Sequence, residues 1–251
     1  MTQNDPMWHD PMELERVVLY DAAAVAHEAA RRFVLQAQTA VDARERFGVV
    51  LSGGSTPTLL YRLLAQPPYR DQVPWHAVHV FWADERCVPP DDPDSNYRLA
   101  CETLLDHVPI LPENVHRLEG ERDPGAAARS YDRALQDFYC GPQPRFDLVL
   151  LGLGHDGHTA SLFPGSPALD EREQLVVPTQ AEYDGRPACR LTLTLPAINA
   201  ARCVIFVVTG ANKAPIVADL FQNRRHSLPA GRVAPTAGEI AWLLDRAAAA
   251  S

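Results

Sequence analysis

GVVLSGGSTPTLLYRLL, residues 48–64, joins a short apolar run to a helical pattern through a glycine-rich turn. Gly48–Leu51 has the length and apolar character of a buried strand, and Pro57–Leu64 has the apolar spacing of a helix. Pro57 is expected as the first helical residue, because the first N–H of a helix has no partner within it and proline lacks that N–H. A strand followed directly by a helix indicates an α/β fold.

The same alternation continues along the chain in both directions. Further strands are expected at Val17–Tyr20, Val78–Trp82, Leu148–Gly152, Leu175–Val177, Leu191–Leu195 and Val204–Thr209. Further helices are expected at Ala22–Val41, Asn96–Leu105, Pro124–Phe138, Lys213–Phe221 and Gly238–Asp245. Strands that alternate with helices predict a mostly parallel sheet covered on both faces, which is a three-layer α/β/α sandwich.

Length and composition fit one domain that spans residues 1–251. The chain has 251 residues, of which 46% are hydrophobic and 22% are charged, close to the averages of globular proteins. It carries 23 basic and 32 acidic residues, a net charge of −9, and no basic cluster. A nucleic-acid partner is therefore not expected.

The cysteines predict reduced thiols in a cytoplasmic protein. Their number is odd, and no two lie two or three residues apart as they do in zinc-binding motifs. The segment Met1–Met12 lacks the charged start and apolar stretch of an export signal. No apolar run approaches the roughly 18 residues of a membrane span, so no membrane partner is expected. The five cysteines are Cys87, Cys101, Cys140, Cys189 and Cys203.

Ligands of open α/β sheets bind beyond the carboxyl ends of the strands, so the loops there are the places to seek a site. The turn after Leu51 has the composition of an anion-binding loop. Its glycines let backbone N–H groups approach an anion, and the following helix start favours a phosphate. The alternative is an ordinary turn in which Thr56 caps the helix. A nucleotide triphosphate is not expected, because no lysine stands at the Walker position. The candidate phosphate-binding residues are Gly53, Gly54, Ser55 and Thr56.

Two cations follow two other strands. Arg86 comes just after Val78–Trp82, beside two acids that either pair with it at the surface or orient its guanidinium toward a phosphate. Lys213 stands at a helix start, where its charge opposes the helix dipole unless an anion compensates; the alternative is a solvated lysine. Three candidate anion contacts from separate loops together favour a phosphate site.

The segment Leu148–Pro164, LVLLGLGHDGHTASLFP, contains Gly-x-Gly-x-x-Gly after a strand, yet a dinucleotide site is not expected. Asp156 would place a carboxylate where the pyrophosphate sits, and Pro164 would break the helix that the motif requires. What remains is a tight glycine loop that presents Asp156 and His158, and histidine titrates near neutral pH. This composition favours catalysis.

Metal binding is the competing interpretation of that loop, since His155, Asp156 and His158 are all potential ligands. A zinc site normally gathers three or four convergent ligands, and neither a cysteine pair nor a His-Glu helix motif supplies the others. No metal and no cofactor are therefore expected.

Four segments resemble the 6-phosphogluconolactonase family: Ser52–Pro57, Asp84–Tyr97, Gly152–Pro164 and Arg190–Lys213. The resemblance runs from about Val17 to Leu244. It implies a Rossmann-like sandwich of the sugar-phosphate isomerase and deaminase type, without nucleotide. It also implies hydrolysis of 6-phospho-D-glucono-1,5-lactone to 6-phospho-D-gluconate in the oxidative pentose phosphate pathway.

The resemblance also implies roles for single residues. The histidine matching His158 accepts a proton from water, and Asp156 matches an aspartate near the reaction centre. Arg86 and Lys213 match residues associated with the substrate phosphate.

The chemistry agrees, because a δ-lactone is a reactive ester that a positioned water and a neutral imidazole can open. The N–H groups of Gly152, Gly154 and Gly157 are candidates for stabilising the oxyanion. The expected partner is the sugar-phosphate lactone, and the expected state is a monomer or a weak homo-oligomer.

Three alternatives remain. The nearest is a glucosamine-6-phosphate deaminase or an aldose–ketose isomerase on the same fold. The deaminase family carries Glu five residues beyond the matching histidine, where this chain has Phe163, and enediol chemistry needs a carboxylate that this segment lacks. A sugar-phosphate sensor that controls transcription would need a DNA-reading element, and only about 16 residues precede the first strand. Thiol chemistry has the least support. Among the candidate loops that follow the strands, the one after Val78–Trp82 contains a cysteine, Cys87, and no histidine stands beside it in the sequence.

Overall fold

The computed structural model describes residues 14–141, 144–182, 185–222 and 227–250, so the expectation for Met1–Met12 lies outside the described residues. Six strands form one sheet in the order β1-β9-β8-β5-β2-β3, and every neighbouring pair is parallel. Their bounds are β1 (Glu15–Leu19), β2 (Phe47–Leu51), β3 (Val78–Trp82), β5 (Leu148–Leu151), β8 (Cys203–Val208) and β9 (Glu239–Asp245).

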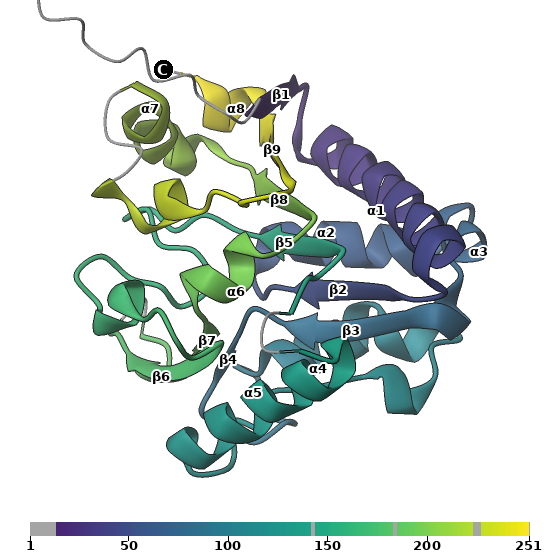
Figure 1. The fold of residues 1–251 in the computed structure, drawn as a ribbon. Coiled ribbons are helices and arrows are strands. Elements are labelled where there is room, and N and C mark those ends of the chain that lie inside the picture. Colours follow the sequence, from purple (N-terminus) through teal and green to yellow (C-terminus); the bar gives the residue numbers. More distant parts are fainter. Residues whose placement is uncertain (1–13, 142–143, 183–184, 223–226, 251) are drawn as a thin grey trace, which may run out of the picture.

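Helices flank this sheet, which confirms the predicted α/β sandwich (Figure 1). The longest, α1, begins after Asp21, whose carboxylate accepts a hydrogen bond from the N–H of Ala24 at 2.8 Å. Its apolar face, with Val25, Ala29 and Phe33, is fully buried and packs on the sheet. The helices are α1 (Ala22–Arg44), α2 (Ser55–Leu64), α3 (Tyr69–Gln72), α4 (Asn96–Thr103), α5 (Pro124–Tyr139), α6 (Leu195–Asn199), α7 (Ala214–Gln222) and α8 (Arg246–Ala249).

A second, antiparallel sheet has the order β4-β7-β6, with β4 (Asp84–Arg86), β6 (Val176–Gln180) and β7 (Cys189–Leu193). The prediction that the apolar runs of β6 and β7 belong to the one mostly parallel sheet is wrong. Only about eight residues join β6 to β7, too few for the helical crossover that parallel neighbours need, so the two strands pair as a hairpin. Ala83 alone separates β3 from β4.

The prediction of a helix at Gly238–Asp245 is also wrong, because Glu239–Asp245 forms β9 between β1 and β8. Ile240 to Leu244 are all buried, and a short apolar run buried on both faces has no period that separates strand from helix. The start of α2 differs from the expectation as well. This helix begins at Ser55, two residues before Pro57, and Gly54 precedes it without a side-chain cap.

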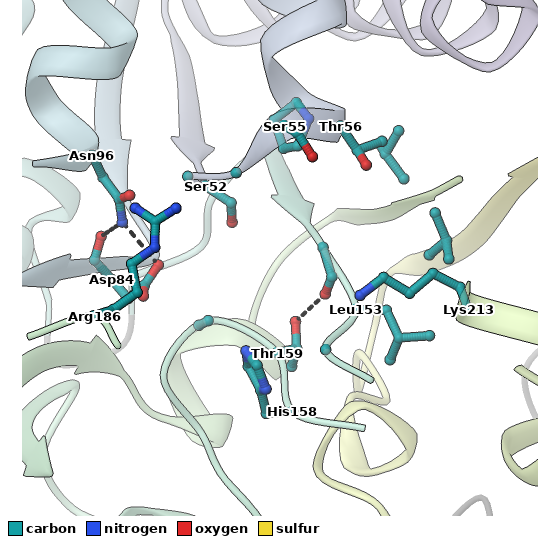
Figure 2. Close-up of a pocket in the computed structure, with 18 of the residues that line it drawn as sticks. Ser52, Ser55, Thr56, Asp84, Asn96, Leu153, His158, Thr159, Arg186 and Lys213 are labelled. Carbon is teal, nitrogen blue, oxygen red and sulfur yellow. Dashed lines mark hydrogen bonds between the residues drawn. The ribbon is translucent and has the colours of Figure 1, made fainter. Parts of the chain in front are cut away.

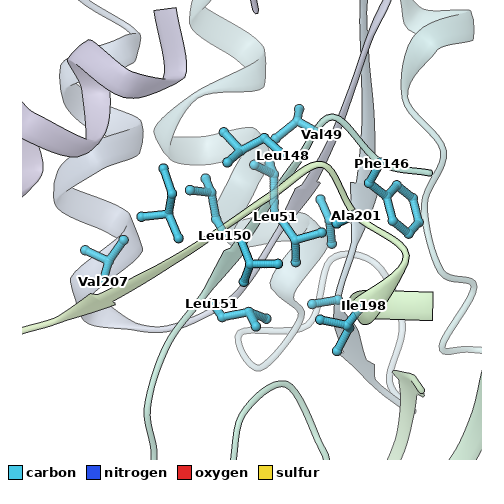
Figure 3. Packing of buried hydrophobic residues seen from close by; sticks show 14 of the residues in the cluster. Val49, Leu51, Phe146, Leu148, Leu150, Leu151, Ile198, Ala201 and Val207 are labelled. Carbon is cyan, nitrogen blue, oxygen red and sulfur yellow. The ribbon is translucent and has the colours of Figure 1, made fainter. Parts of the chain in front are cut away.

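The core lies on both faces of the central strands (Figure 3). Val49 and Leu51 on β2 and Leu148 and Leu150 on β5 are at most 1% exposed, and Phe146 lies in the same cluster. Burial of this kind stabilises a fold by about 25 cal/mol per Å² of apolar surface. None of the helices in the described part of the chain combines the length and the apolar character that a bilayer crossing requires.

Strands β2 and β5 are neighbours at the centre of the parallel sheet, with β3 beyond β2 and β8 beyond β5. The connections that leave β2 and β5 therefore diverge to opposite sides. Such a switch point opens a crevice at the carboxyl ends of the strands, and this is where open α/β sheets bind ligands.

Candidate active site

A pocket of about 280 Å³ lies at this switch point (Figure 2). All four loops singled out in the sequence contribute to it. Its polar and glycine lining consists of Ser52, Gly53, Gly54, Ser55, Thr56, Asp84, Arg86, Asn96, Gly152, Gly154, His158, Thr159, Arg186, Arg190, Thr209 and Lys213. Asp156 and Gly157 belong to the same loop as His158 but do not line the pocket.

His158 is held by Asp156 behind it. Nδ1 of the imidazole lies 2.6 Å from Oδ1 of Asp156, and the same oxygen accepts the backbone N–H of His158 at 3.1 Å. Because a carboxylate only accepts, the ring proton belongs on Nδ1 and the lone pair on Nε2. Burial raises the pKa of Asp156, but the hydrogen bonds and charge of His158 outweigh it, so the pKa is lowered and the carboxylate stays ionised. His155 is exposed and lies outside the pocket.

The glycines of this loop let it fold tightly under the histidine. The N–H of Gly154 donates to the carbonyl of His158 at 2.8 Å, and the N–H of Gly157 donates to the carbonyl of Gly154 at 3.1 Å. Gly157 has a φ of +84°, a conformation that favours glycine. Both amides, which the sequence suggests as candidate donors to an oxyanion, are therefore engaged inside the loop.

The loop after β2 presents backbone N–H groups at the start of α2. Gly54 has a φ of +112°, and no side chain caps the first N–H groups of the helix. Gly54, Ser55 and Thr56 all line the pocket. Oγ1 of Thr56 lies 3.1 Å from Oγ1 of Thr209, which ties this loop to the end of β8. A helix start of this kind is a favourable place for an anion.

Glu85 does not form an ion pair with the side chain of Arg86. Its buried carboxylate accepts the backbone N–H groups of Arg86, Asn96 and Tyr97 at 2.7–2.8 Å and the hydroxyl of Ser95 at 3.0 Å. Burial raises the pKa of Glu85 and the N–H donors oppose this rise. The carboxylate therefore fixes the start of α4 beside the pocket, a role that differs from orienting a guanidinium.

Two further arginines line the pocket. Arg190 on β7 faces Arg86 on β4 as its register partner and is only 4% exposed, while the sequence alone leaves open whether it reaches a ligand. Arg186 pairs with Asp94 at 2.6 Å and half of its side chain is exposed. The antiparallel pairing of β4 with β7 brings these two arginines to the pocket. No short sequence motif predicts this pairing.

Lys213 reaches the pocket from the side opposite Asp84 and Arg186 (Figure 2). It ends the short 3₁₀ turn Ala211–Lys213, which follows β8 and precedes α7. The structure thus brings Lys213, Arg86 and the loop after β2 around one cavity, as the sequence predicts for their positions.

Among the described residues, no group of three or more histidine, cysteine, aspartate or glutamate side chains is arranged to hold a metal ion. The metal interpretation of His155, Asp156 and His158 therefore gains no support from the structure.

Comparison with known proteins agrees with this geometry. Residues 20–242 match the family model described as glucosamine-6-phosphate isomerases/6-phosphogluconolactonase. A 6-phosphogluconolactonase of Nostoc sp. is 44% identical over 239 residues, which cover 93% of this chain and 96% of the relative. The crystal structure of a 6-phosphogluconolactonase from Thermotoga maritima has a TM-score of 0.81 at 28% identity and covers 93% of this chain and 100% of its own. A monomeric glucosamine-6-phosphate deaminase, 21% identical, shares the fold with a TM-score of 0.80 over 94% of this chain and 99% of its own. The chain belongs to the glucosamine-6-phosphate isomerase/6-phosphogluconolactonase family.

Proposed function

We propose that this chain hydrolyses 6-phospho-D-glucono-1,5-lactone to 6-phospho-D-gluconate, a step of the oxidative pentose phosphate pathway. Relatives that carry the name 6-phosphogluconolactonase and match nearly its whole length support the assignment. The observation that carries the mechanism is the 2.6 Å contact between His158 and Asp156 beside a pocket lined with cations.

His158 is the general base. Its Nε2 takes a proton from water while the water oxygen attacks C1 of the lactone, and the imidazolium that forms is stabilised by the Asp156 carboxylate. When the tetrahedral intermediate collapses, the bond from C1 to the ring oxygen breaks and His158 returns the proton to that oxygen. The product is a carboxylic acid that ionises in water.

The phosphate binds at the other side of the pocket. We expect the N–H groups of Gly54, Ser55 and Thr56 and the ammonium of Lys213 to hold it, together with Arg86, which lines the same pocket. Fixing the phosphate sets the distance between C1 and His158, which is how binding energy accelerates the chemical step. Gly53 cannot carry a side chain, because a Cβ there would stand 1.8 Å from the Asn96 amide oxygen.

A deaminase remains the second candidate because its fold is the same. Phe163 stands where that family has its glutamate, and its ring lies 4.2 Å from the ring of His158, centroid to centroid. An apolar ring cannot serve as the carboxylate base that enediol chemistry requires. Ammonia release from glucosamine 6-phosphate would favour this candidate.

The deciding experiment is a coupled assay with freshly generated lactone, measured above spontaneous hydrolysis. We expect His158→Ala to lower kcat by about 10² to 10⁴ while binding of 6-phosphogluconate is kept. Wild-type turnover no faster than the background would contradict the proposed function. A cytoplasmic location and a monomeric or weakly associating state are proposed with it, and light scattering tests the second.

A further inference from the structure

Two of the three amides considered for stabilising charge at C1 are already occupied. Attack of water on a lactone places a full negative charge on the former carbonyl oxygen, and that charge requires hydrogen-bond donors. The N–H groups of Gly154 and Gly157 donate within their own loop. Gly152, which lines the pocket, is the third of these amides, and a side-chain donor in the pocket would add to it.

Arg190 is a buried cation with open donors in this pocket. It is 4% exposed, and in the part of the chain that the structure describes its Nε and Nη2 have no hydrogen-bond partner. An unsatisfied buried guanidinium destabilises a protein unless an anion or an acceptor joins it. Asp84 supplies a compensating charge nearby, but none of the described hydrogen bonds of Asp84 comes from Arg190.

Arg190 lies on the same side of the site as the imidazole. Its Cζ is 5.4 Å from the centroid of the Phe163 ring, within cation–π range, and the ring of His158 lies 4.2 Å from the same ring, centroid to centroid. The guanidinium and the catalytic imidazole thus contact one aromatic ring. Arg86 differs from Arg190 in its contacts, because its Nη1 donates a hydrogen bond to the carbonyl of Asp94 at 2.6 Å.

The positions of the loop and of β7 are locked together. The N–H of Ser161 donates to Oγ1 of Thr192 at 3.2 Å, and its hydroxyl donates to Asp84 at 2.6 Å. Thr192 is the register partner of Asp84. Arg190 lies two residues before Thr192, so the side chains of Arg190 and Thr192 project from the same face of β7. The chain just after His158 is therefore fastened to the strand that carries Arg190.

We propose that Arg190 is a further catalytic residue, whose Nε and Nη2 donate hydrogen bonds to the oxyanion at C1 and then to the carboxylate of the product. This assignment rests on the proposed lactone hydrolysis. One pocket thus has two anion sites, with the phosphate held at the start of α2 by Lys213 and the developing charge at C1 held by Arg190. The carbonyl electron pair moves to the oxygen as water attacks and returns when the ring C–O bond breaks.

The first test uses two ligands that share a phosphate and differ at C1: 6-phosphogluconate, which has a carboxylate there, and glucitol 6-phosphate, which has none. Wild type should bind the carboxylate compound at least about tenfold more tightly in calorimetry. Arg190→Met should abolish this preference and keep the affinity for glucitol 6-phosphate. Lys213→Met should weaken binding of both ligands equally. No preference in wild type, or an equal loss of both ligands in Arg190→Met, overturns the proposal.

The second test separates turnover from binding. Arg190→Met should lower kcat by about 10² to 10³, the range for losing an oxyanion donor, with KM for the phosphorylated lactone within about threefold. Arg190→Lys keeps the buried charge beside Asp84 and should retain the fold with an intermediate kcat, since an ammonium lacks the planar fork. A raised KM with an unchanged kcat would make Arg190 a phosphate ligand and contradict the proposal.

A matched control addresses stability. Arg202→Met removes a partly buried arginine that pairs with Asp147 before the start of β8 and does not line the pocket. It should leave kcat unchanged even if the melting temperature falls. Failure of the proposed function is recognised separately, because wild type itself would then not accelerate lactone opening. If wild type hydrolyses the lactone but does not prefer 6-phosphogluconate over glucitol 6-phosphate, the proposed role of Arg190 is refuted and the proposed function stands.

Discussion

Gly154 lies directly against the ring of His158, so that a Cβ built on this glycine would stand 2.1 Å from Nδ1 and 2.3 Å from Cε1. Real Cβ atoms do not approach a heavy atom so closely. The glycine therefore makes room for the catalytic ring.

Gly154→Ala should consequently displace the imidazole and lower kcat by about 10²-fold, the lower range for loss of a general base. Gly141→Ala is the control, because a Cβ there meets no atom within 4 Å. The lactone assay compares both variants with wild type, and a normal kcat for Gly154→Ala would show that the ring position is not critical.

Asp156→Asn should lower kcat while leaving KM for the lactone nearly unchanged. The asparagine amide keeps the size of the side chain but removes the charge that stabilises the imidazolium and selects its tautomer. Because Asp156 has a lowered pKa, its carboxylate is ionised throughout the neutral range. Steady-state kinetics from pH 6 to 8 would check this, and a kcat equal to that of wild type would argue against the pair.

Lys213→Met and Arg86→Met should act mainly on binding. Both side chains line the pocket and are expected to hold the phosphate, so their loss should raise KM for the lactone by about tenfold or more per charge-assisted contact. Binding of inorganic phosphate by wild type and both variants gives an independent readout. Unchanged phosphate affinity in both variants would contradict the phosphate site.

Glu28 supplies a stability prediction far from the pocket. Hydrogen bonds from Arg31 and Arg32 outweigh burial and lower the pKa of Glu28 from 4.5 to about 2. A lowered pKa in the folded state means that the stabilisation is complete above pH 4.5 and is lost as the pH falls toward 2. Glu28→Gln should therefore cost about 0.5–1 kcal/mol at pH 7 and nothing near pH 2. Urea titrations across this range test the trend, and a constant difference would refute it.

The strand–turn–helix units were predictable because their signals are local. Val78–Trp82 is a strand with the expected bounds, and Ser95 caps α4 through the N–H of Arg98, since capping depends on a few adjacent residues. Glu239–Asp245 was not predictable, because its apolar run acquires strand geometry only from β1 and β8 on either side.

The site residues likewise divide into those that a short loop makes recognisable and those that only strand pairing brings to the pocket. Gly54, Asp156 and His158 stand out in the sequence because their chemistry is concentrated in short loops. The burial of Arg190 depends instead on the pairing of β4 with β7, two strands about a hundred residues apart. The role of Glu85 was also missed, since its partners at the start of α4 lie ten to twelve residues further on.

The antiparallel hairpin of β6 and β7 has a consequence for how substrate choice can change. Its strand β7 carries Arg190 into the cavity, and Arg186 lines the cavity just before that strand, yet neither belongs to the parallel sheet. Altering Arg186, whose side chain is half exposed, can reshape the cavity while Arg190 and His158 stay in place. Sugars of different size can thus be admitted or refused by changing one side chain outside the parallel sheet.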